Sequence, residues 1–100
     1  MELTLRHIDN PPPGFKEYVS EKVSHLSRFG VNIDRITLVA GDEHTHDLDR
    51  RYSMEIVVMS RGQRFVAKAA GPNLNVAADD AVARLSRQIV KHKERRKERT

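Results

Sequence analysis

A stripe of basic side chains near the end of the chain is the strongest chemical signal in the sequence. Arg84, Arg87 and Lys91 are spaced by three and four residues, so on a helix they would project from successive turns of one side. Arginine can hold a phosphate through two parallel hydrogen bonds, and a row of such charges can follow a phosphate backbone. No aromatic residue lies between these positions, which disfavours the base stacking used by single-strand binders. The pattern therefore predicts a surface that binds structured RNA.

Basic charge is concentrated at the C-terminal end. The chain has 18 Lys and Arg residues against 14 Asp and Glu residues, a net charge of +4. Residues 91–100 contain six basic and two acidic side chains and so account for the whole excess; we expect Lys93, Arg95 and Arg96 to extend the basic field outward. A neutral body with a basic end indicates an anionic partner at that end, although a solvated helix end or a frayed tail would show the same run.

A second basic group lies on the first predicted helix. Lys22, His25 and Arg28 follow one another at intervals of three residues, beside that helix's apolar stripe. We include all three among the candidate RNA-binding residues. Taken alone, Lys22 is more typical of a surface lysine whose aliphatic stem lies along the protein.

The run from His44 to Asp47 is the one candidate metal site in the sequence. Two histidines two residues apart, with Asp42, Glu43 and Asp49 nearby, have the side chains that Zn²⁺ prefers. No second pair of ligands elsewhere would complete the coordination, so we interpret residues 42–49 as an acidic loop and expect no metal.

Other enzyme chemistry finds little support. The five glycines are scattered, which excludes a glycine-rich phosphate loop, and there is no Gly-x-Ser-x-Gly elbow. The absence of cysteine excludes a disulfide framework and a thiol nucleophile. We expect a protein that is not an enzyme and that uses neither a cofactor nor a small-molecule substrate.

Length and composition favour one small domain. One hundred residues, 38% of them apolar, support a single modest core over residues 1–100. The longest apolar run, from Ile56 to Met59, is too short to span a membrane, and the N-terminus shows no secretory signal. We expect a cytoplasmic protein with no membrane partner.

Apolar periodicity predicts the elements. Alternation with period two predicts strands over about 2–7, 35–41, 52–58 and 65–69, with a turn at Arg61-Gly62 between the last two. A helical stripe begins at Phe15 and ends at Gly30, with the prolines at 11–13 suited to its first turn and Asn10 to its cap. A second helix begins near Leu74, capped by Asn73 or Asn75, and its apolar pattern stops at Val90. Its last turns, if helical, should project away from the core.

This order, β-α-β-β-β-α, indicates an α+β fold. Cleanly alternating strands have one covered face, so both helices should pack on one face of a four-stranded sheet. The first β-α-β unit can link two parallel strands, and the remaining strands should form a meander.

The closing helix carries a recognisable motif. Asn73-Leu74-Asn75-Val76-Ala77-Ala78-Asp79, followed by Arg84-Leu85-Ser86-Arg87-Gln88-Ile89-Val90-Lys91-His92-Lys93, resembles the last helix of the ribosome hibernation-promoting factor family. That family is also called the ribosomal subunit interface or sigma-factor modulation proteins. The start of the chain, the segment from Glu21 to Leu26 and the order of elements are similar to it as well.

The resemblance implies a fold like a double-stranded-RNA-binding domain with an extra first strand. It also implies binding to the small ribosomal subunit in the channel used by mRNA and tRNA, which keeps ribosomes idle in starved or stationary-phase cells. Carried over by position, the family's basic residues that face ribosomal RNA correspond to Lys22, Arg84, Arg87, Lys91 and Lys93.

The chain departs from the family pattern at several positions. His25 stands where the family usually has Lys, Asn75 where it has Tyr, and Asn73 where it has an acidic cap. The prolines at 11–13 replace a more ordinary helix start, and the 42–49 loop is longer than usual. We expect these departures to change the contacts that the loops make more than they change the fold.

The length is similar to that of the short members of the family, which lack a ribosome-dimerising second domain. Pairing of ribosomes with a ribosome-dimerising partner factor and silencing of single ribosomes both stay open from the sequence. Two alternatives stay open from the sequence: a protein-interaction regulator of a transcription sigma factor, as one family name suggests, and a metal-dependent hydrolase that uses His44 and His46.

Overall fold

The computed structural model describes residues 2–6, 11–29, 32–42 and 51–98 of the chain. The elements run β1 (Glu2–Arg6), α1 (Phe15–Ser24), the short 3₁₀ helix η1 (His25–Phe29), β2 (Arg35–Asp42), β3 (Tyr52–Ser60), β4 (Gln63–Gly71) and α2 (Leu74–Glu98). Apart from η1, this is the β-α-β-β-β-α order that the periodicity predicts.

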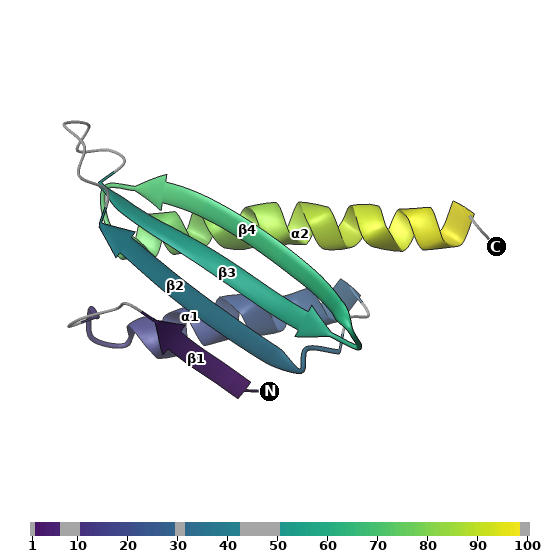
Figure 1. The fold of residues 1–100 in the computed structure, drawn as a ribbon, viewed down its shortest axis with the longest axis horizontal. Coiled ribbons are helices and arrows are strands. Elements are labelled where there is room, and N and C mark those ends of the chain that lie inside the picture. Colours follow the sequence, from purple (N-terminus) through teal and green to yellow (C-terminus); the bar gives the residue numbers. More distant parts are fainter. Residues whose placement is uncertain (1, 7–10, 30–31, 43–50, 99–100) are drawn as a thin grey trace.

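The four strands form one mixed sheet in the order β1-β2-β3-β4. β1 pairs with β2 in parallel, as expected for a β-α-β unit, and the other neighbours pair antiparallel. Figure 1 shows α1 and α2 behind the same face of the sheet, with α2 along β3 and β4. No helix in the described part of the chain covers the opposite face of the sheet.

The core fills the space between the sheet and the two helices. Alternate residues of each strand point toward the helices, and one stripe of each helix points back, as the sequence pattern requires. The largest fully buried side chains are Phe15, Ile36, Leu38, Met54, Ile56, Leu85, Ile89, Val19, Val23 and Val58. The α+β fold with both helices on one face is therefore confirmed.

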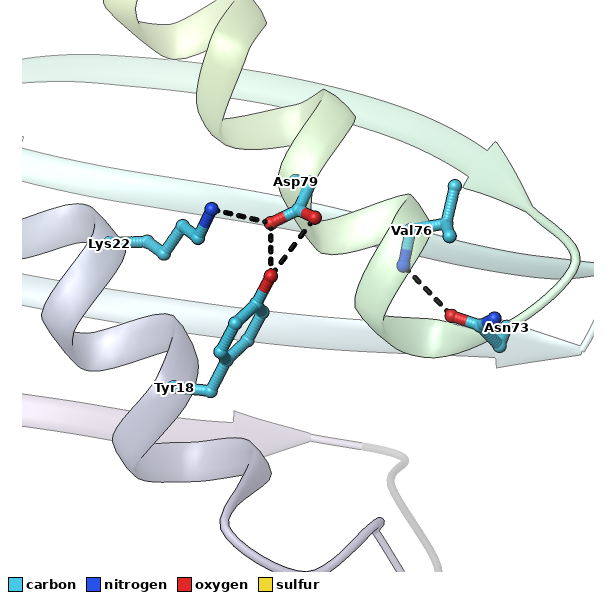
Figure 2. Close-up of polar contacts among 5 residues, drawn as sticks. All are labelled: Tyr18, Lys22, Asn73, Val76 and Asp79. Carbon is cyan, nitrogen blue, oxygen red and sulfur yellow. Dashed lines mark hydrogen bonds and ion pairs between the residues drawn. The ribbon is translucent and has the colours of Figure 1, made fainter.

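Two local signals fix the connections around β4. Arg61 and Gly62 both have positive φ, 49° and 81°, as in the tight turns that suit a twisted hairpin. At the other end of β4, the Oδ1 atom of Asn73 accepts a hydrogen bond from the backbone N–H of Val76 at 2.9 Å (Figure 2). Asn73, not Asn75, is therefore the cap of α2.

The first helix begins at Phe15, where its apolar stripe was predicted to begin, but the segment before it differs from the prediction. The prolines precede the helix instead of forming its first turn: the Phe15 N–H donates to the Pro12 carbonyl at 3.0 Å, and Gly14 takes a left-handed φ of 73°. A chain that turns sharply before the helix needs glycine at this point, because other residues rarely adopt that φ. Asn10, the predicted cap, lies outside the described residues.

The last turns of that helix are also different, because after Ser24 the chain tightens into η1. Short 3₁₀ segments are common at the ends of helices. Gly30 lies outside the described residues, as does the 42–49 loop beyond Asp42, which itself pairs with Tyr52 at the end of β2. No helix in the described part of the chain is long and apolar enough to cross a membrane.

Candidate nucleic-acid interface

Helix α2 is longer than the sheet that supports it. Among the side chains of α2 that the structure describes, the last buried one is that of Ile89, whereas the helix continues to Glu98. Figure 1 shows its C-terminal part extending past the end of the sheet. The protein is correspondingly elongated, with extents of 48 × 25 × 18 Å. The expectation that the last turns project from the core is confirmed, and residues up to Glu98 are helical.

The predicted basic stripe is exposed on α2, but its members have different surroundings. Arg84, Arg87 and Lys91 all have exposed side chains. The Nη1 atom of Arg84 donates to the backbone carbonyl of Lys68 in β4 at 2.9 Å. Arg84 is thus partly committed to a structural contact. Arg87 and Lys91 follow it at intervals of three and four residues along the exposed side of the helix.

The hydrogen bond from Arg84 is one of a row of contacts between side chains of α2 and the outer edge of β4. β4 is an edge strand, whose outward carbonyls would otherwise be open to pairing with another chain. Gln88 Nε2 donates to the Val66 carbonyl at 2.6 Å, one turn after Arg84. Further along, the ring of His92 meets Phe65 edge to face, with 5.5 Å between ring centroids. One flank of α2 is therefore fixed along β4.

The other flank of α2 contacts α1 through a polar cluster. Lys22 Nζ lies 3.2 Å from Asp79 Oδ1, and the Tyr18 hydroxyl donates to the same carboxylate, 2.8 Å from Oδ1 and 3.0 Å from Oδ2 (Figure 2). The ammonium of Lys22 also lies 5.2 Å from the centroid of the Tyr18 ring. The hydrogen bond and the negative charge of Asp79 raise the pKa of Tyr18 and the pKa of Lys22 above their ordinary values.

The predicted basic residues consequently divide into two groups. His25 and Arg28 are exposed in η1, where a period of three residues places them on one side, and with Lys22 they form the α1 group. Arg84, Arg87 and Lys91 form the edge group. Because α2 faces α1 through Asp79 and β4 through Arg84, the two groups lie on opposite flanks of α2.

The remaining candidates lie near the end of α2. Lys93 is exposed, but two residues beyond Lys91 it projects from a different side of the helix. Arg95 and Arg96 are on helical backbone, and their side chains lie outside what the structure describes.

A basic set on the open face of the sheet was not predicted from the sequence. The strand register places these side chains on the face opposite the buried ones, where Lys68 pairs with Glu55 across β3 and β4. The basic residues of this face are Arg6, Arg35, Arg64 and Lys68, and all are exposed. The sequence could have indicated this set, because successive side chains of a strand point to opposite faces and these basic residues alternate with the apolar ones.

No metal centre is present among the residues that the structure describes, where no group of three His, Cys, Asp or Glu side chains could hold an ion. His44 and His46 lie outside that part of the chain.

Comparison with known proteins identifies the family. A sequence profile described as Sigma 54 modulation protein / S30EA ribosomal protein matches residues 1–97. The chain belongs to this family.

Individual family relatives agree with this assignment. A ribosome hibernation promoting factor from Azotobacter vinelandii is 34% identical over 84 residues, which cover 84% of this chain and 74% of that protein. Among solved structures, the N-terminal domain of Thermus thermophilus Protein Y superposes with a TM-score of 0.69 at 22% identity, covering 91% of this chain and 94% of that one. A ribosomal subunit interface protein from Coxiella burnetii gives 0.70 at 17% identity, with coverages of 94% and 99%. These two structures share the fold of this S30EA-family chain.

Proposed function

We propose that this chain is a ribosome hibernation factor that binds the small ribosomal subunit and occupies the channel used by mRNA and tRNA. The observation that carries the proposal is α2, a helix anchored on both flanks that holds Arg87 and Lys91 exposed on its outer side. Membership of the S30EA family, and the name of the Azotobacter vinelandii relative, support the ribosome as the partner.

The mechanism is occupancy. Lysine and arginine side chains that neutralise phosphates release condensed counterions, which supplies affinity without any covalent step. The domain would then stand where mRNA and tRNA need to pass, and protein synthesis would stop until it leaves. No catalytic residue, cofactor or small-molecule substrate takes part in this mechanism, and its place is the cytoplasm, where the ribosomes are.

The geometry supports two RNA contacts instead of one. The edge group of Arg84, Arg87 and Lys91 and the α1 group of Lys22, His25 and Arg28 lie on either side of α2. In a channel with RNA walls, each group would meet a different wall. Lys93, Arg95 and Arg96 would extend the contact along the projecting end of α2.

Translation in vitro tests the proposal. With increasing protein, synthesis should fall in proportion to the fraction of small subunits that carry it, measured by sedimentation of the same mixtures. Undiminished synthesis with saturated subunits would refute steric occupancy. Absence of binding to purified small subunits would instead favour the regulator of a sigma factor.

A further inference from the structure

An acidic side chain lies within the proposed RNA-binding surface. Asp79 is near the start of α2 and contacts Lys22 at 3.2 Å and Tyr18 at 2.8 and 3.0 Å (Figure 2). The side chains of Lys22 and Asp79 are 44% and 40% exposed, so a ligand can reach both. The carboxylate therefore holds a cation that the proposed function assigns to RNA.

Stability alone does not account for this arrangement. An ion pair that is this exposed contributes little to folding, because water screens the charges and two side chains must be ordered. The two helices are already joined through the common core, in which Val19 and Val23 of α1 and Leu85 of α2 are fully buried. The contact is therefore available for a role in binding.

We propose that Asp79 is an internal competitor of RNA phosphate for Lys22 and that it limits the affinity of the ribosome complex. This inference rests on the proposed function. A phosphate oxygen in contact with Lys22 Nζ would lie within about 6 Å of the Asp79 carboxylate, because that carboxylate is 3.2 Å from Nζ. Two negative charges at this distance repel each other, so RNA gains only part of the attraction of Lys22. A hibernation factor that must later be released gains reversibility from such a contact.

Tyr18 moderates the competition. Its hydroxyl has one proton, and that proton is donated to Asp79. The hydrogen bond satisfies part of the accepting capacity of the carboxylate and so weakens its hold on Lys22. Removal of the hydroxyl leaves Lys22 as the partner that remains, which strengthens the ion pair without changing any charge.

Affinity for purified small subunits, measured at about 0.1 M monovalent salt, tests both residues. Asp79→Asn should tighten binding by about three- to tenfold, since it removes the competing charge but keeps an acceptor for Tyr18. Asp80→Asn is the matched control, because it removes the same charge from the next, exposed position; it should tighten binding by less than about twofold. The difference between these variants should vanish when Lys22→Gln is added to both. Tyr18→Phe should weaken binding by about twofold.

Two results would overturn the role of Asp79: equal effects of Asp79→Asn and Asp80→Asn, or weaker binding by a folded Asp79→Asn protein. If Asp79→Asn does not fold, Tyr18→Phe decides, and unchanged or tighter binding by that variant overturns the inference. The proposed function fails separately, when the unchanged protein saturates small subunits without lowering synthesis. The assignment of RNA binding to α2 fails when an Arg87→Gln/Lys91→Gln protein binds small subunits as tightly as the unchanged protein. A weakened double variant together with equal Asp79 and Asp80 effects refutes the competition alone.

Discussion

Salt dependence offers the sharpest test of the edge group on α2. Arg87 and Lys91 are exposed and lie four residues apart, which places them about 6 Å apart along the helix axis. Each phosphate that they neutralise should contribute about 0.7–0.9 to the slope of log affinity against log salt. The variant Arg87→Gln/Lys91→Gln should therefore lose about 1.4–1.8 units of slope while keeping good helix formers.

This change in slope is large enough to measure. Between 50 and 200 mM monovalent salt at constant magnesium, the unchanged protein should lose roughly 7- to 12-fold more affinity for small subunits than the double variant. Lys16→Gln, which removes one exposed charge from the start of α1, is the control and should leave the slope nearly unchanged. A correctly folded double variant with the original slope would refute the assignment of Arg87 and Lys91 to phosphate.

Arg84 should behave differently from its neighbours in the stripe. Its hydrogen bond to the Lys68 carbonyl must be shared or broken before it can hold a phosphate. Arg84→Gln should therefore change the slope by less than half of one contact, and should lower the free energy of unfolding by about 0.5 kcal/mol in urea titration. A full unit of lost slope with unchanged stability would contradict this division of roles.

Three further predictions concern stability. Leu85→Ala, at a fully buried position of α2, should lower the free energy of unfolding by about 2–5 kcal/mol in denaturant titration. Gly71→Ala should cost about 1–3 kcal/mol in the same assay, because the new Cβ would lie 3.1 Å from the Ala77 backbone nitrogen. Folding raises the pKa values of Tyr18 and Lys22, so their protonated forms stabilise the protein below about pH 10, and this stabilisation is lost as the pH rises through the folded-state pKa values. In thermal unfolding between pH 10 and 12, the melting temperature of the Tyr18→Phe protein should therefore fall less steeply than that of the unchanged protein.

Much of the fold was predictable from the sequence because burial of one face of each strand makes apolar residues recur at every second position. Ile36, Leu38, Ile56 and Val58 alternate with exposed or half-buried residues, and only one face of the sheet is covered. The place of the prolines relative to the first helix was not predictable in the same way. Proline suits both a first helical turn and a turn before a helix, and the left-handed φ of Gly14 selected the second.

The part of the candidate site that lies on one helix was predictable from residue spacing. Spacing placed Arg84, Arg87 and Lys91 on one side of α2, and the structure keeps all three exposed. Residue spacing gave no indication of which other elements pack beside that helix. The bond from Arg84 to β4 spans 16 residues of sequence, and the bond from Tyr18 to Asp79 spans 61, so both depend on the packing of separate elements.

The anchoring of α2 explains why a helix, and not a loose basic tail, presents these charges. Its core face is buried, one flank is bonded to β4 through Arg84 and Gln88, and the other flank meets α1 at Asp79. Once this anchored part of the helix has formed, further turns can be added at little cost in free energy, because each residue that is ordered gains one backbone hydrogen bond. Charges on such a helix are ordered before the ligand arrives, so binding need not supply the conformational entropy that a disordered segment would lose. The same packing of α2 against α1 places Lys22 beside Asp79. If both proposals hold, the anchoring that favours phosphate contacts at Arg87 and Lys91 weakens the one at Lys22.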